Sequence, residues 1–118
     1  MSRILLCTGK VYYDLQAKRA AHPTGDVAIL RLEQLYPLAD ADLEKALSPY
    51  KAGTEVVWVQ EEPFNMGGWY FMQARWPKGL EEKHPLSCVS RPESASPATG
   101  SAASHKYEQQ LLVDQALA

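Results

Sequence analysis

The chain has 118 residues, with 12 basic and 14 acidic side chains and a formal net charge of −2. A chain of this length is expected to fold as one domain over residues 1–118, around a single hydrophobic core. The small net charge provides no global electrostatic field, so neither nucleic acid nor a membrane surface is an expected partner.

The cysteine pattern and the lack of a long apolar run indicate a reducing compartment. Cys7 and Cys88 each lie in a short apolar run, without metal-ligand spacing or a C-x-x-C pattern, which predicts buried and unpaired thiols. No apolar run approaches the roughly 18 residues that span a bilayer, and residues 1–7 lack the pattern of a signal peptide. We therefore expect a bacterial cytoplasmic protein or one of the mitochondrial matrix.

Short apolar runs alternate with helical patterns along the chain. Strands are expected at residues 4–7, 27–32, 55–60 and, more weakly, 86–90. Helices are expected at residues 11–21, from Asp40 to Tyr50, between Trp69 and Trp76, and at 105–117. In the first helix, Asp14 and Lys18 have the spacing of an i,i+4 ion pair on the solvent side. The small-residue segment 94–104 is interpreted as an ordered loop that leads into the last helix.

This alternation predicts an α/β fold with a mostly parallel sheet, right-handed crossovers and helices on both faces. The loops that leave the C-terminal ends of parallel strands emerge at one edge, where ligands of such folds usually bind. The distinctive polar residues of the chain fall on or near those loops. They include Lys10, Glu33, Glu61, Glu62, Asn65 and Arg91. We expect Lys10 and Arg91 to face a cluster of carboxylates across this edge.

The adjacent carboxylates Glu61 and Glu62 allow two interpretations, a general acid/base pair or a set of ion-pairing residues at an interface. Neighbouring residues of a strand point in opposite directions, so without a sharp bend they do not straddle one bond as a catalytic pair does. Asn65 is suited to accept from the first N–H groups of the next helix, and Gly67-Gly68 lets the backbone approach another surface. These residues therefore favour ion pairing or an interface over catalysis.

Other patterns for catalysis or ligand binding are weak. Thr8-Gly9-Lys10 is only a fragment of a phosphate loop, and the helix start after Gly67-Gly68 lacks a G-x-G-x-x-G or Walker pattern. The three histidines are scattered and form neither a metal site nor the base of a nucleophile. We expect no catalytic residue, no cofactor-binding residue and no metal site in this chain.

Four long segments carry a family resemblance. They are LLCTGKVYYDL (residues 5–15), LRLEQLYPL (30–38), VWVQEEPFNMGGWYF (57–71) and SRPESASPATGSAASHKYEQQLLVDQAL (90–117). Together and in this order they resemble the C-terminal domain of thiamine diphosphate-dependent 2-oxoglutarate dehydrogenase. They cover nearly the whole chain, and the last two are far more specific than any short motif.

The resemblance implies a transketolase C-terminal-like domain, a three-layer α/β sandwich with a mostly parallel five-strand sheet. It also implies a parent enzyme of the tricarboxylic acid cycle that decarboxylates 2-oxoglutarate on thiamine diphosphate and magnesium. That enzyme passes the succinyl group to the lipoyl arm of dihydrolipoyl succinyltransferase. This domain would pack against the other domains of its subunit and against the homodimer mate. Because the family's Gly-Asp-Gly cofactor pattern is absent here, the chain alone is expected to be inactive and to hold no cofactor.

Two alternatives stay open at this stage. The first is a binding module that holds a small anion, such as a nucleotide or acyl-coenzyme A, between Lys10 and Arg91. The second is the same domain from a dehydrogenase of a longer 2-oxo acid such as 2-oxoadipate, because substrate contacts lie mostly outside this segment.

Overall fold

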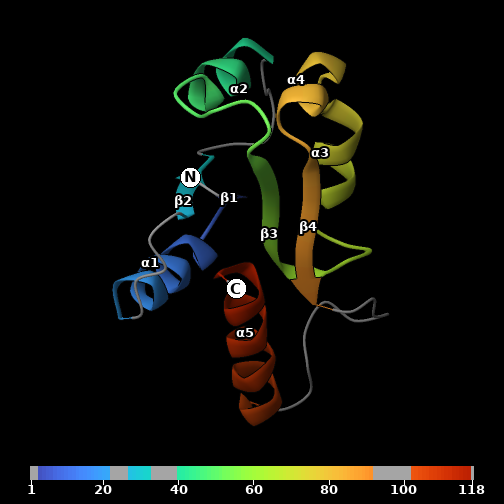
Figure 1. The fold of residues 1–118 in the computed structure, drawn as a ribbon. Helices are drawn as coiled ribbons and strands as arrows, with labels where there is room; N and C mark the ends of the chain where they lie inside the picture. The colour runs from blue at the N-terminus through green and yellow to red at the C-terminus, as the bar shows by residue number, and fades with distance from the viewer. Residues whose placement is uncertain (1–2, 22–26, 33–39, 92–101, 118) are drawn as a thin grey trace.

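A computed structural model describes residues 3–21, 27–32, 40–91 and 102–117 of the chain (Figure 1). The strands in these residues are β1 (Arg3–Cys7), β2 (Val27–Arg31), β3 (Glu55–Pro63) and β4 (Leu86–Arg91). The helices are α1 (Val11–Ala21), α2 (Asp40–Leu47), α3 (Trp69–Arg75), α4 (Lys78–Lys83) and α5 (Ala102–Leu117). The predicted α/β class and the four predicted strands are confirmed.

The strands form one sheet with the order β2-β1-β3-β4, and every neighbouring pair is parallel. β1 lies inside the sheet, where Arg3 is beside Val27 on one side and beside Glu55 on the other. Parallel neighbours cannot be joined by a tight hairpin, which is why helical segments separate successive strands. The described residues give a sheet of four strands, all parallel, where the family resemblance implied five strands, mostly parallel.

One face of the sheet is covered by α2, α3 and α4. Ile4, Leu6, Val56 and Trp58 point to this face, because alternate residues of a strand share a side. The helices contribute Leu43, Leu47, Trp69, Met72 and Leu80 to the same core. Trp58 is only 1% exposed, so the middle of β3 lies inside this core.

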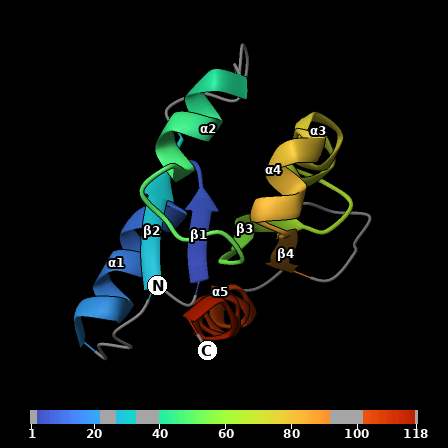
Figure 2. The same ribbon diagram turned by 45° about the horizontal axis from the view of Figure 1, so that its top comes forward.

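The opposite face is covered by α1 and α5. Leu5, Cys7, Val57 and Val59 point to this side of the sheet. The helices supply Val11, Leu15, Leu112, Val113, Ala116 and Leu117. Figure 2 shows α5 on one side of β3 and β4, with α3 and α4 on the other. Helices on both faces, and therefore three layers, agree with the predicted architecture.

Several helix boundaries differ from the predicted ones. α2 ends at Leu47, and the next residues form a turn in which the Tyr50 N–H donates to the Leu47 carbonyl at 3.0 Å. α3 ends at Arg75, and the additional helix α4 follows Pro77. The sequence pattern missed α4 because it has only six residues and one buried side chain, Leu80.

The last helix begins earlier than predicted. α5 starts at Ala102, so the end of the segment interpreted as a loop is helical, while residues 94–101 lie outside the described residues. No helix in the described ranges is both long and apolar enough to cross a membrane.

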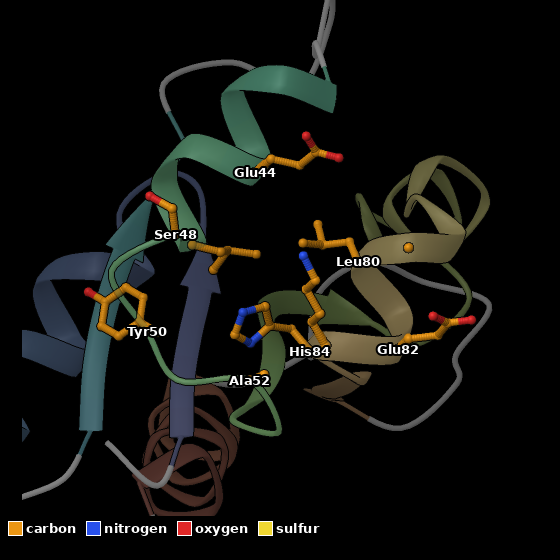
Figure 3. Close-up of a pocket in the computed structure, with 10 residues that line it drawn as sticks. Glu44, Ser48, Tyr50, Ala52, Leu80, Glu82 and His84 are labelled. Carbon is orange, nitrogen blue, oxygen red and sulfur yellow. The ribbon is translucent and has the colours of Figure 1, made fainter.

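A recess of about 590 Å³ opens between α2 and α4, near the edge of the sheet where β3 begins (Figure 3). We call it the α2–α4 recess. Its lining residues are Glu44, Leu47, Ser48, Tyr50, Ala52, Gly79, Leu80, Glu82, Lys83 and His84. It lies at the opposite edge from the C-terminal ends of the strands.

Candidate functional site

The C-terminal ends of β1, β3 and β4 meet at one edge of the sheet, which we call the rim. The rim comprises Thr8–Lys10 after β1, Gln60–Glu62 near the end of β3, and Arg91 at the end of β4. Thr8 Oγ1 donates a hydrogen bond of 2.9 Å to the Leu32 carbonyl, which ties the loop after β1 to the end of β2. Glu33, predicted at this edge, lies outside the described residues.

A bulge in β3 sets the direction of the two adjacent glutamates. Val59 is opposite Val89 in the parallel register, yet Pro63 is opposite Arg91, so β3 carries extra residues between these points. A bulge bends its strand and re-aims the side chains. β3 therefore includes both glutamates and continues to Pro63, beyond the predicted end at residue 60.

Glu61 and Glu62 lie on opposite sides of this strand end. The Glu61 carboxylate forms an ion pair with Lys10 at the start of α1. Glu62 lines a cavity on the α3 side together with Gly67 and Phe71. The two carboxylates do not converge on one point, as the alternation of side chains along a strand requires.

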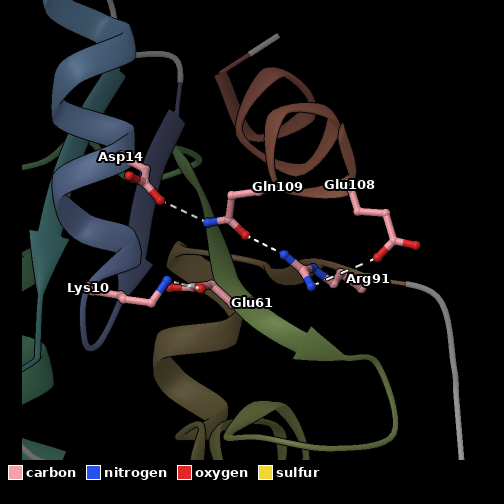
Figure 4. A network of polar contacts seen from close by, with 6 residues as sticks. All are labelled: Lys10, Asp14, Glu61, Arg91, Glu108 and Gln109. Carbon is pink, nitrogen blue, oxygen red and sulfur yellow. Dashed lines mark hydrogen bonds and ion pairs between the residues drawn. The ribbon is translucent and has the colours of Figure 1, made fainter. Parts of the chain in front are cut away.

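A second set of polar contacts joins the end of β4 to α1 and α5 (Figure 4). The Arg91 Nη2 donates to Gln109 Oε1 at 2.7 Å, and Gln109 Nε2 donates to Asp14 Oδ2 at 2.9 Å. Glu108 Oε2 lies 3.8 Å from Arg91 Nη1. Because Arg91 is only 5% exposed, its guanidinium is an internal tie between β4 and α5.

The two cations predicted at this edge therefore have separate partners. Lys10 is largely exposed and contacts Glu61, whereas Arg91 is buried against α5. Asp14 and Lys18, predicted to pair with each other, both reach α5 instead. Lys18 Nζ lies 3.0 Å from Asp114 Oδ1. These contacts link α1 to α5 across the sheet face.

Gln60 is the residue of the rim that the sequence analysis missed. Its Oε1 accepts from the Trp58 indole N–H and from the Trp69 backbone N–H, both at 2.9 Å. Its Nε2 donates to the carbonyls of Met66 at 2.7 Å and Pro63 at 2.9 Å. Because Gln60 is 3% exposed, this amide fixes the turn between β3 and α3 from the inside.

The predicted capping role of Asn65 at the start of α3 stays a prediction. The N-cap residue of α3 is Gly68, which has no side chain to cap the helix. The amide oxygen of Gln60 accepts from the Trp69 N–H, the first N–H of the helix. The signal for the role of Gln60 was its position, directly between the apolar run that ends at Val59 and the acidic pair. A buried amide at such a position needs several hydrogen-bond partners.

A cavity of about 400 Å³ lies beside Gln60 on the α3 side of the rim. Gly67 lines this cavity and has a φ of 72°, a backbone angle that residues with a side chain rarely adopt. A Cβ at this position would lie 3.1 Å from Gln60 Oε1 and from the Glu62 side chain. The close approach therefore requires glycine. Phe64 stacks edge-on against Tyr70, with ring centroids 5.8 Å apart, and both rings are exposed.

The cysteines are free thiols, as predicted. Cys7 is fully buried, whereas Cys88 is only partly buried, so the prediction of two buried thiols holds for Cys7 alone. Burial raises the pKa of each thiol to about 11. The charge of Arg31 lowers the pKa of Cys7, and a hydrogen bond with Ser90 lowers that of Cys88, but both effects are smaller than the effect of burial. These thiols are poor nucleophiles at neutral pH.

The fold and the site together define the class of domain to which this chain belongs. The chain is an α/β domain with a parallel sheet between two helical layers, and its rim is occupied by ion pairs and buried amide hydrogen bonds. Within the part of the chain that the structure describes, no three His, Cys, Asp or Glu side chains group as metal ligands.

Comparison with known proteins gives the family. The family model described as "2-oxoglutarate dehydrogenase C-terminal" matches residues 1–117. The 2-oxoglutarate dehydrogenase E1 component of Haemophilus influenzae is 46% identical over 99% of this chain and 12% of its own length. That of Cupriavidus necator is 41% identical over the whole chain and 12% of its own length. The "Multifunctional 2-oxoglutarate metabolism enzyme" of Mycolicibacterium vanbaalenii is 43% identical over 97% of the chain and 9% of its own length. The chain belongs to the 2-oxoglutarate dehydrogenase C-terminal domain family, as its four long segments predicted, and it spans about an eighth or less of these relatives.

Proposed function

We propose that this chain is a structural and assembly domain of a 2-oxoglutarate dehydrogenase E1 component. The parent enzyme decarboxylates 2-oxoglutarate on thiamine diphosphate and transfers the succinyl group to the lipoyl carrier of dihydrolipoyl succinyltransferase, within the tricarboxylic acid cycle. The observation that carries this proposal is the family match over residues 1–117, in a chain that corresponds to only 12% of the Haemophilus influenzae protein. The relatives named above carry 2-oxoglutarate in their names, which favours it over 2-oxoadipate.

The rim supplies the surface for this role. Glu61 and Arg91 are engaged with Lys10 and α5, so they hold the rim together from within. Glu62 is exposed, and Phe64, two residues further along the chain, contacts Tyr70, their rings being 36% and 49% exposed. A carboxylate next to exposed aromatic rings is typical of a surface that another protein covers. We assign this surface to contact with the other domains of the parent subunit or with its homodimer mate.

Thiamine diphosphate and its magnesium ion do not fit the residues of this chain. The sequence contains no Gly-Asp-Gly segment. Glu61 faces Lys10, and Glu62 faces the α3 side, so the adjacent carboxylates do not converge on one cation. We therefore assign no cofactor contact and no catalytic step to this chain, and we place the cofactor in the rest of the parent subunit.

A chimeric enzyme tests the assignment. The segment of the Haemophilus influenzae E1 component that matches this chain is replaced by the 118 residues, and a second variant lacks the segment altogether. We expect the chimera to form the same oligomer as the parent and to decarboxylate 2-oxoglutarate, and the deletion variant to fail at assembly. Sedimentation and decarboxylation rates are the measurements. A correctly assembled chimera without activity on 2-oxoglutarate would contradict the proposal.

The isolated chain provides the matching control. Calorimetry with thiamine diphosphate and magnesium should give no heat of binding at micromolar concentrations. A panel of nucleotides and acyl-coenzyme A in a thermal-shift assay should leave the melting temperature unchanged, because Lys10 and Arg91 already contact acceptors within the chain. A saturable shift with one of these anions would favour the effector-binding module instead.

A further inference from the structure

Arg31 is an exposed arginine that two tyrosine rings hold at the end of β2. β2 is an outer strand of the described sheet, and Figure 2 shows α1 beside it. The guanidinium carbon of Arg31 lies 5.2 Å from the centroid of the Tyr13 ring and 5.6 Å from that of Tyr12. Arg31 Nη1 donates to Tyr13 Oη at 3.2 Å. We call these three residues the α1–β2 cluster.

Further contacts of α1 keep the cluster in place. The two tyrosine rings meet edge to face, with centroids 5.4 Å apart, and Gln16 Nε2 donates to Tyr12 Oη at 2.7 Å. Arg19 Nη2 donates to Gln16 Oε1 at 2.7 Å, and Arg19 Nη1 donates to the Val27 carbonyl at 2.9 Å. These bonds run from the cluster to the first residue of β2. Because the rings are fixed, Arg31 loses little conformational freedom when it binds a partner.

Arg31 differs from the other arginines Arg3, Arg19 and Arg91 in what its guanidinium contacts. Those three each donate to a carboxylate, carbonyl or amide oxygen of the chain. Within the part of the chain that the structure describes, Arg31 donates to the Tyr13 hydroxyl and forms no ion pair with a carboxylate. A guanidinium carries five N–H donors, so most of those of Arg31 remain for an acceptor outside these residues.

The shape and composition of the cluster indicate the kind of partner. Tyr13 is 59% exposed, and Arg31 beside it is exposed as well. Small ligands bind in clefts that enclose most of their surface, whereas this cluster is open to solvent. Tyrosine and arginine are enriched at the centres of protein–protein contacts. A guanidinium pairs best with a carboxylate, through two parallel N–H···O bonds. The cluster therefore fits an acidic side chain on another protein surface.

We propose that the α1–β2 cluster binds an aspartate or glutamate side chain of another domain of the parent E1 subunit, with Arg31 as the donor and the Tyr13 ring as the adjoining apolar contact. This inference rests on the proposed function, because the chain spans only 12% of the Haemophilus influenzae protein and most of such a subunit lies outside it. β2 is parallel to β1, so its end at Arg31 lies at the same edge of the sheet as the rim. The cluster therefore extends the surface already assigned to the other domains.

A cleavable form of the Haemophilus influenzae chimera measures this contact. A protease site is placed before residue 1 of the chain, so that after cleavage only non-covalent contacts retain the 118 residues. Dilution and sedimentation then give the Kd of the cleaved chain. Arg31→Met keeps an apolar stem without the guanidinium and should raise this Kd about thirtyfold or more, as truncation of a buried ion pair does. Lys45→Met removes an exposed charge from α2 and is the matched control, with an unchanged Kd.

Arg31→Lys separates this contact from a purely internal role of Arg31. The lysine keeps a cation near the tyrosine rings, so the melting temperature of the isolated chain should stay unchanged. Docking in the cleaved chimera should still weaken, because an ammonium group cannot form two parallel bonds with a carboxylate. Added salt should weaken docking of the unsubstituted chain more than that of Arg31→Met, since it screens an ion pair. Equal salt dependence of the two would contradict the proposed contact.

Arginine labelling gives an answer that does not depend on activity. Phenylglyoxal, followed by mass spectrometry, should modify Arg31 in the isolated chain and leave it unmodified in the intact chimera. Arg91, which is 5% exposed, is the internal control and should react slowly in both. Equal modification of Arg31 in the two proteins would overturn the inference and leave the proposed function standing, as would equal Kd values for Arg31→Met and Lys45→Met.

Two other outcomes have distinct meanings. Protection of Arg31 in the isolated chain by inorganic phosphate, with a cleaved chimera insensitive to Arg31→Met, would assign the cluster to a free anion and would overturn the inference. Failure of the unsubstituted, uncleaved chimera to assemble would instead count against the proposed function.

Discussion

The side-chain oxygen of Gln60 accepts the backbone N–H of Trp69, nine positions further along the chain, at a distance of 2.9 Å. This bond is made from inside the molecule at the start of α3, whose N-cap residue Gly68 has no side chain. The same amide donates to the carbonyls of Pro63 and Met66 on the intervening turn. One buried side chain therefore determines the shape of the segment that carries Glu62 and the exposed aromatic rings.

Replacement of Gln60 should destabilise the chain strongly. Gln60→Ala leaves the indole N–H of Trp58 and the backbone N–H of Trp69 without their acceptor in a buried place, at a cost of about 2–4 kcal/mol. Gln73→Ala, on the exposed side of α3, is the control and should change stability by less than about 0.5 kcal/mol. Urea denaturation of the two variants measures the difference. Equal stabilities would mean that water replaces the amide, and that the turn does not depend on it.

Truncation of the central tryptophan tests the core between β1 and β3. Trp58 is 1% exposed and packs under α2, α3 and α4, so Trp58→Ala should cost about 3–5 kcal/mol through the cavity it leaves. Tyr70→Ala removes a ring that is 49% exposed and should cost less than about 1 kcal/mol. Thermal and chemical denaturation give the comparison. A loss below that of Tyr70→Ala would be incompatible with this packing.

The two adjacent glutamates should respond differently to truncation. Glu62→Ala should change the stability of the isolated chain by less than about 0.5 kcal/mol, since its exposed carboxylate has no ion pair among the described residues. Glu61→Ala removes the ion pair with Lys10, and such a pair contributes about 0–1 kcal/mol when one partner is exposed. In the chimeric enzyme the order reverses, with Glu62→Ala causing the larger loss of dimerisation or decarboxylation. An unaltered chimera together with a destabilised isolated chain would identify Glu62 as an internal element of the fold.

The thiols give a pH dependence with a definite sign. Burial raises the pKa of both from the ordinary value of 9.0 to about 11 in the folded chain, and unfolding restores the ordinary value. Below about pH 9 both states keep the thiols protonated, so their contribution to stability is complete. Between about pH 9 and 11 the unfolded state ionises first, so this contribution is lost as the pH rises.

Unfolding free energies at pH 8 and pH 10.5 measure that loss, and the double variant Cys7→Ala, Cys88→Ala should show a smaller fall across the same interval. Thiol labelling at pH 8 should modify Cys88 before Cys7, because Cys88 is only partly buried. Both should react rapidly after unfolding. A pH dependence that is identical in the chain and its double variant would show that other groups cause it.

The positions of β1, β2 and β3 could be predicted because each contains a short apolar run between polar turns, which is the pattern of a buried parallel strand, whereas β4 alternates polar and apolar residues and gave a weaker signal. The polar contacts of the rim and of α1 could not be predicted from the sequence. Asp14 and Lys18 have ideal spacing for each other, but Gln109 and Asp114 of a distant helix provide partners that the local sequence does not reveal. The role of Gln60 depends on the bulge that follows Val59, and a bulge has no periodic signature. α4 was missed because a six-residue helix between two prolines offers too few apolar positions for a pattern.

The sheet order also has a consequence for biosynthesis. β1 is the first of these four strands to leave the ribosome, yet it lies in the interior of the sheet and must await residues 55–63 to satisfy its second edge. α5 is made after all four strands, and it covers the face formed by Leu5, Val57 and Val89. Until that helix has been synthesised, the nascent chain presents an apolar sheet surface to the surrounding solution. Its escape from aggregation during translation therefore depends on how soon α5 can dock, or on a chaperone that covers the same face in the meantime.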